Sequence, residues 1–107
     1  MVLTDEWLQE ARDDLNAELE YVYNKFGSQS AEKAYRKVVE SIANLCRFPH
    51  LGEHFKDIVY REYEVRTLSM KQTSIIYCVR EDKLLIIALW NNRRDDKTLQ
   101  TMIKSRQ

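Results

Sequence analysis

The residues best suited to chemistry form one short run late in the chain. An aromatic ring, two amides and two cations follow a long apolar stretch without interruption: Trp90, Asn91, Asn92, Arg93 and Arg94. Such a combination can stack on a base or anchor a protein partner. A tryptophan in this context is more often part of a core, and arginines at a strand end are equally typical of a solvated turn. The run is therefore a candidate binding surface with a structural alternative.

Two further arginines, Arg61 and Arg66, are candidates for the same functional surface, and they lie in the stretch 58–68, where apolar and charged residues alternate. Arg61 is in phase with the apolar positions, which places it on the core side of a predicted strand. A buried arginine requires a carboxylate partner, and Asp14 or Glu18 on the overlying predicted helix could supply one. We therefore favour a structural salt bridge over a functional role for Arg61.

One histidine pair has the spacing of a metal site without its context. His50, Glu53 and His54 match the HxxEH pattern of one metalloprotease class. That site needs a helix that presents both histidines on one face, and a third ligand further along. Pro49 and Gly52 disfavour a helix here. We expect a loop, and we predict neither a metal nor another cofactor.

The composition is that of one globular domain, which we place at residues 1–107, with 44% hydrophobic and 32% charged residues. No apolar run approaches the roughly 20 residues of a membrane span, and the first residues lack the features of a signal peptide. Cys46 and Cys78 form no CxxC pair, which is typical of buried thiols in a reducing compartment. We therefore expect a cytoplasmic protein that does not associate with membranes.

The charges balance in number but not in position. Seventeen acidic and seventeen basic side chains cancel, so no overall field draws the chain to nucleic acid. Residues 1–26 hold seven acids and two bases, whereas residues 27–107 hold ten acids and fifteen bases. Charge matching inside the fold and a functional basic face explain this asymmetry equally well.

Apolar residues at spacings of three and four predict two helices at the start of the chain. The first begins at Thr4 or Asp5 and stops at Gly27, and the second ends before Pro49. Because the link between them is only about three residues, they must form an antiparallel hairpin. The apolar stripe of the first helix consists of Leu8, Ala11, Leu15, Leu19, Val22 and Phe26.

After Pro49 the period changes to two, and strands are predicted at 58–68, 74–79 and 84–90. Tight links between them require antiparallel pairing. The last strand is apolar on both faces, so we expect it to be central or covered. The expected fold class is α+β, with an N-terminal helical hairpin packed on an antiparallel sheet of three to four strands. A short C-terminal helix would follow, and a partner or the tail itself would cover its apolar residues: Leu99, Met102 and Ile103.

Several motifs, in this order and spacing, resemble the RelE/ParE toxin superfamily across residues 5–99. They are Trp7-(x)3-Ala11-(x)2-Asp14-Leu15, Phe26-Gly27-Ser28, Leu45-(x)2-Phe48-Pro49-(x)-Leu51-Gly52, Tyr60-Arg61, Ile75-Ile76-Tyr77, and Ile86-Ile87-Ala88-Leu89-Trp90 leading into Asn92-Arg93-Arg94-Asp95. The resemblance implies a toxin of a type II toxin–antitoxin module, held inactive by a cognate antitoxin. RelE-like members cut messenger RNA on the ribosome, and ParE-like members inhibit DNA gyrase.

The departures from the RelE-like pattern favour the ParE branch. The arginine that precedes the paired third-strand motif in RelE-like nucleases falls on Ser74, and their late aromatic falls near Leu99. Only the arginine after the last strand is kept, as Arg93 or Arg94. We therefore expect a gyrase inhibitor without assigned catalytic residues, alone or in a complex with its antitoxin, in homo- or hetero-oligomers. A ribosome-dependent mRNA endoribonuclease and a non-toxic antitoxin-binding module are the alternatives.

Overall fold

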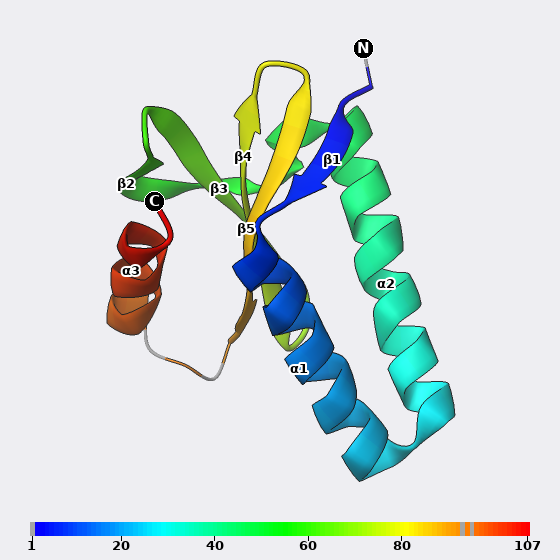
Figure 1. The fold of residues 1–107 in the computed structure, drawn as a ribbon. Helices are drawn as coiled ribbons and strands as arrows, with labels where there is room; N and C mark the ends of the chain where they lie inside the picture. The colour runs from blue at the N-terminus through cyan, green and yellow to red at the C-terminus, as the bar shows by residue number, and fades with distance from the viewer. Residues whose placement is uncertain (1, 93, 95) are drawn as a thin grey trace.

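A five-stranded sheet separates two helical layers, as the computed structural model shows for residues 2–92, 94 and 96–107 (Figure 1). A helical hairpin, α1 and α2, lies against one face, and the short helix α3 lies against the other. In chain order the elements are β1 (Thr4–Trp7), α1 (Gln9–Phe26), α2 (Ser28–Arg47), the 3-10 helix η1 (Pro49–Leu51), β2 (Glu53–Tyr60), β3 (Tyr63–Ser69), β4 (Thr73–Arg80), β5 (Lys83–Asn91) and α3 (Asp96–Ser105).

The strands are arranged in the order β1-β5-β4-β3-β2, with β1 parallel to β5 and every other pair antiparallel. Each central strand sends alternate side chains into two cores. Ile75, Tyr77 and Ile86 face the hairpin, while Ile76 and Ile87 face α3. β5 is buried along its length, as expected for a strand that is apolar on both faces.

The helical hairpin forms as the apolar spacing predicts. Gly27 adopts φ +96°, which a glycine tolerates and which ends α1 directly before α2 begins. α2 buries Val38, Ile42 and Leu45, which recur at helical spacing. The predicted α+β class, with a hairpin on a sheet and a short C-terminal helix, is confirmed.

The edges of the sheet differ from the sequence prediction. Thr4 and Asp5 do not cap a helix, because Thr4–Trp7 forms the edge strand β1 alongside β5. The physical reason lies in β5, whose backbone on that side requires hydrogen-bond partners. With β1 and β2 added, the sheet has five strands instead of three to four, and one of its pairings is parallel.

The predicted strand 58–68 is a hairpin of two strands. Arg61 and Glu62 form the turn between β2 and β3, and Arg61 adopts φ +56°. Because Tyr60 pairs with Tyr63, the core-facing positions are even-numbered in β2 (Ile58 and Tyr60) and odd-numbered in β3 (Tyr63 and Val65). The apolar but exposed Val59 continues the odd-numbered pattern and concealed this change of phase. Arg61 is therefore exposed in a turn, and the prediction that it faces the core was wrong.

Both cysteines are buried and free, as predicted. Burial raises the pKa of the Cys46 thiol, and it raises that of Cys78 to about 11. Since the thiolate is the reactive form, neither residue is a candidate nucleophile at neutral pH. Within the described ranges, no helix combines the length and apolar character needed to cross a membrane.

The loop after α2 is fastened to the sheet by one tyrosine. The Tyr77 hydroxyl donates to the Pro49 carbonyl oxygen (2.6 Å) and accepts from the Gly52 backbone N–H (3.0 Å). Arg66 adds a third bond, from Nη1 to the Gly52 carbonyl oxygen (2.7 Å). Gly52 is buried so closely against Tyr77 that a Cβ at this position would overlap the phenol. The loop therefore requires glycine because of space and not because of its φ angle.

We predict that Gly52→Ala lowers the free energy of unfolding by about 1–3 kcal/mol, because the new methyl group displaces the Tyr77 ring. Tyr77→Phe removes the atom nearest to that methyl group and also costs about 1–3 kcal/mol, since two loop groups lose their partner. Urea denaturation of both variants and the double variant measures the coupling. The double variant should cost less than the sum of the two; strict additivity would contradict the proposed contact.

Candidate functional site

The run that ends β5 is partly core and partly surface. Trp90 is 5% exposed and packs with Leu99 and Ile103 of α3. The Arg94 guanidinium lies over its ring, 4.5 Å from the centroid. The exposed Arg94 side chain thus stacks on a buried aromatic ring, and this cation–π contact holds the guanidinium at a defined place on the surface. Arg93 lies outside the described residues.

The two amides of this run have structural contacts. Asn92 accepts a hydrogen bond from the Ser74 hydroxyl (2.6 Å) and donates from its side chain to the Met70 carbonyl oxygen (3.1 Å). Its backbone N–H donates to the Gln72 carbonyl oxygen (2.9 Å). Asn92 therefore closes the loop between β3 and β4 against the end of β5. Asn91 is half-buried at the end of the strand.

The arginines do not converge on one site. Arg61 lies in the β2–β3 turn, whereas Arg94 follows β5 at the opposite end of the sheet. Arg66, 22% exposed, is held by the Gly52 carbonyl oxygen and by Glu64 (3.6 Å). Arg66 thus anchors the loop after α2. The expected pairing of Arg61 with Asp14 or Glu18 does not occur, because Arg61 lies in an exposed turn and Asp14 binds another arginine.

A cavity of about 280 Å³ lies on the α3 face of the sheet, where the RelE-like pattern would place its catalytic groups. Its described lining contains no arginine or lysine: Glu53, His54, Phe55, Thr67, Ser69, Ser74, Trp90, Asn92 and Leu99. Ser74 is buried and bonded to Asn92, and Leu99 is 3% exposed. Metal-independent RNA cleavage requires cations that stabilise the developing phosphorane charge. The described lining offers no arginine or lysine for this role, and its one histidine, His54, lies 3.4 Å from a Glu64 carboxylate oxygen.

The histidine pair does not form a metal site. His50 lies in η1, and His54 lies in β2, where its Nε2 is 3.4 Å from a Glu64 carboxylate oxygen. Among the residues with described positions, no cluster of histidine, cysteine and carboxylate side chains could hold a metal ion. The expected loop is a single 3-10 turn leading into a strand.

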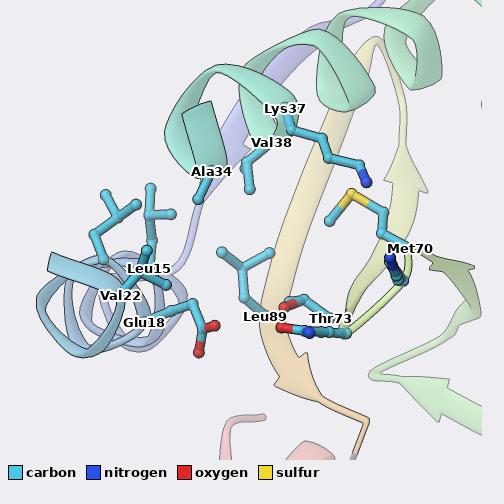
Figure 2. Close-up of a pocket in the computed structure, with 12 residues that line it drawn as sticks. Leu15, Glu18, Val22, Ala34, Lys37, Val38, Met70, Thr73 and Leu89 are labelled. Atoms are coloured by element: carbon cyan, nitrogen blue, oxygen red, sulfur yellow. The ribbon is translucent and has the colours of Figure 1, made fainter. Parts of the chain in front are cut away.

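Sequence reasoning missed an apolar groove between the hairpin and the end of the sheet. Of the predicted core stripe of α1, Ala11 is fully buried, Leu15, Leu19 and Val22 are half-buried, and Phe26 is 65% exposed. The groove has a volume of about 190 Å³, and Figure 2 shows side chains from both helices and from β5 facing across it. We call it the hairpin groove; it is lined by Leu15, Glu18, Leu19, Val22, Ala34, Lys37, Val38, Met70, Lys71, Gln72, Thr73 and Leu89.

The length of α1 was the available signal for this groove. Eighteen helical residues span about 27 Å, and the apolar stripe continues past the part of the sheet that can cover it. A monomer that leaves such a stripe open is typical of a protein that buries it against a partner.

Over residues 6–96 the sequence matches the family described as ParE toxin of type II toxin-antitoxin system, parDE. The chain belongs to the ParE toxin family. A solved structure titled "Chromosomal ParDE TA system from P. aeruginosa" has the same fold, with a TM-score of 0.69 and 22% sequence identity over 84% of this chain and 96% of that one. No curated protein matches the sequence. The expected membership in the RelE/ParE superfamily, in its ParE branch, is confirmed.

In this ParE family member the tail covers its own apolar stripe. Leu99 and Ile103 are buried against the sheet, and Met102 is half-buried beside them. Gln107 secures the end of the tail, because its side chain donates to the Val59 carbonyl oxygen (2.9 Å) and accepts from the Arg61 backbone N–H (2.7 Å). These three apolar residues would be available to a partner only if α3 left the sheet.

Arg106 fastens the tail to the hairpin. Its guanidinium donates to both carboxylate oxygens of Asp14, at 2.7 and 3.1 Å, and to the Ile87 carbonyl oxygen at 2.9 Å. Asp14 in turn accepts from the Leu89 backbone N–H at 3.1 Å. The two side chains are only 14% and 23% exposed. Arg106 lies one helical turn beyond Ile103, so the spacing of the α3 stripe could have identified it.

We predict that Asp14→Ala and Arg106→Ala each lower the free energy of unfolding by about 1–3 kcal/mol. Each variant leaves a largely buried charge without its counter-charge, and each removes the side-chain partner of one backbone group, the Leu89 N–H or the Ile87 carbonyl oxygen. The double variant should cost less than the sum by at least about 0.5 kcal/mol, and amide exchange in α3 should accelerate in all three. The exposed pair Glu32–Arg36 is the control, and Arg36→Ala should cost under about 0.5 kcal/mol. Equal effects at both pairs would refute the special role of Arg106.

Proposed function

We propose that this ParE family toxin arrests bacterial growth by binding DNA gyrase in the cytoplasm, without catalysing a reaction. The observation that carries the proposal is the cavity on the α3 face, whose described lining contains no arginine or lysine to stabilise the charge of a phosphoryl transition state. Ser74 and Leu99, which occupy the matched nuclease positions, are buried and packed within the fold. Membership in the ParE family supports the same target class.

The basic pair after β5 is the part of the surface that we propose for contact with the target. Arg94 is exposed, and the buried Trp90 ring holds its guanidinium in place. A positioned cation at the rim of a surface contributes orientation and association rate to a protein complex. Arg93 precedes it in the sequence and belongs to the same proposal.

For the cognate antitoxin we propose docking in the hairpin groove. Its lining is mainly aliphatic but includes Glu18, Lys37 and Lys71, and Figure 2 shows Lys37 and Glu18 on different sides of it, which suits an amphipathic helix. The sheet edges are less suited to an added strand. β1 has only four residues, and the pairing of β2 with β3 is interrupted between His54 and Val59. The apolar residues of α3 remain a second proposed contact that requires its displacement.

The target is tested by pulse labelling of DNA and protein synthesis in one bacterial culture after induction without the antitoxin. We expect DNA synthesis to stop first, and purified protein to inhibit supercoiling by gyrase. Arg93→Ala combined with Arg94→Ala should weaken both effects without unfolding the protein. The control removes Lys33 and Arg36 from α2 and should behave like the wild type. If protein synthesis stops first, the ribosome is the target and the gyrase proposal fails.

The groove is tested with two neighbouring positions of α1. Val22 lines it, whereas Tyr23 is 57% exposed outside it. Val22→Glu should weaken antitoxin binding by about tenfold or more, because a carboxylate would be desolvated against an apolar surface, while Tyr23→Glu should bind normally. Titration calorimetry with the purified antitoxin measures both. Equal affinities of the two variants would show that the antitoxin binds elsewhere.

A further inference from the structure

The hairpin groove continues into a second hollow that reaches Arg94. This hollow has a volume of about 170 Å³ and shares three lining residues with the groove: Glu18 of α1, Thr73 of β4 and Leu89 of β5. Ala17 and Arg94 line the second hollow and not the groove, and both are exposed. We call it the Arg94 hollow. The antitoxin site and the target contact proposed above therefore adjoin one another around Glu18.

A third hollow joins the same depression. It has a volume of about 60 Å³, and it shares Glu18, Val22 and Gln72 with the hairpin groove. With the Arg94 hollow it shares Glu18 and Asn91. Glu18, which is half-buried, thus lines all three hollows. Together they form one depression along α1 that connects the hairpin groove with Arg94.

A helix docked in the hairpin groove would also cover the Arg94 hollow. With its side chains, an α-helix is about 10–12 Å across. The part of α1 that borders the groove runs from Leu15 to Val22, which corresponds to a rise of only about 10 Å. Glu18 lies near the middle of this part, so a helix wide enough to fill the groove also extends over the hollow that adjoins it at Glu18.

The contacts of Arg94 restrict how it can respond to a bound helix. Its guanidinium lies over the Trp90 ring, 4.5 Å from the centroid, and Trp90 is 5% exposed. Turning away from the depression would break this cation–π contact. A helix over the Arg94 hollow therefore meets the guanidinium in the same place in which it is proposed to meet the target.

We propose that the antitoxin neutralises the toxin from the hairpin groove by covering Arg94, so that antitoxin and target compete for one continuous surface. This mode of neutralisation rests on the proposed function, namely the antitoxin in the groove and the target at Arg94. It requires no movement of α3, because the depression lies on the hairpin side and is open while the Asp14–Arg106 ion pair is formed. The apolar residues of α3 are then unnecessary for neutralisation.

Cysteine reactivity tests this coverage in the full-length protein. Ala17→Cys and Arg94→Cys place a thiol at the Arg94 hollow, and Glu62→Cys is the control, at an exposed position in the β2–β3 turn. Both native thiols are buried, so they compete poorly for an alkylating reagent. With the cognate antitoxin at about 100 times its Kd, alkylation of Ala17→Cys and Arg94→Cys should slow at least about tenfold, while that of Glu62→Cys should not change. Unchanged alkylation at both hollow positions would overturn the proposal.

Calorimetry with Val22→Glu separates this result from a failure of groove docking. If that variant loses affinity while the thiols of the hollow stay reactive in the wild-type groove, the antitoxin occupies the groove and leaves Arg94 uncovered. Only the proposed coverage of Arg94 then fails. If Val22→Glu binds the antitoxin normally, groove docking itself fails, and the coverage of Arg94 from the groove fails with it.

Two further measurements distinguish competition from displacement of α3. Sedimentation of toxin, antitoxin and gyrase together should show no complex of all three proteins, and such a complex would contradict competition for one surface. Amide exchange in α3 should not accelerate when the antitoxin binds. Faster exchange there would show that the antitoxin acts by displacing α3, and this result would also overturn the proposal.

Discussion

The fold depends on how the open side of β5 is closed. β1 pairs with β5 only as far as Ile86, and the chain then turns away into α1. Beyond that point the ladder with β4 shifts by one residue at Ile87, so the Ile87 carbonyl and the Leu89 N–H are left facing the uncovered side. Unpaired backbone groups at a buried position are costly. The Asp14 carboxylate accepts from the Leu89 N–H, and the Arg106 guanidinium donates to the Ile87 carbonyl oxygen. These two side chains make the hydrogen bonds that the backbone of a longer β1 would otherwise make.

This closure also decides which surfaces are available for binding. Arg106 joins the end of α3 to α1, so the tail on one face of the sheet and the hairpin on the other are held together at the edge of β5. With α3 in place, the apolar residues on its side are buried against Trp90 and its neighbours. The hairpin carries no such cover, and the apolar residues of α1 beyond Ala11 remain accessible. Partner binding is therefore expected on the hairpin side, where no part of the fold must first be displaced.

The regular elements were predictable from the sequence, but the connections between them were not. Spacing identified both helices, the central strands and α3, because each has one continuous apolar pattern. It failed across the turn at Arg61, where the exposed but apolar Val59 concealed a change of phase between β2 and β3. It also failed where an element is too short to show a period, as in β1. The expectation that Arg61 pairs with Asp14 or Glu18 was also wrong, since Asp14 pairs with Arg106. Asp14 and Arg106 are 92 positions apart, so the sequence around either residue does not indicate that they pair. The one available sign is that Arg106 continues the helical spacing of the apolar stripe of α3.

The candidate site keeps the fold but differs from the RelE-like pattern at the positions that face the sheet cavity. Where a RelE-like nuclease pattern has an arginine, Ser74 forms a short bond to Asn92, and Asn92 holds the β3–β4 loop. Ser74 therefore has a structural role. An arginine at this buried position would break the hydrogen bond to Asn92 and would require a carboxylate partner nearby. A cation after β5 persists as Arg94, but it is stacked on Trp90 and exposed rather than directed into the sheet cavity. Cations at an exposed rim serve recognition better than catalysis, because water screens the charge that a reaction would require. This distribution of charge, more than the absence of any one residue, supports the proposal that the toxin acts by binding.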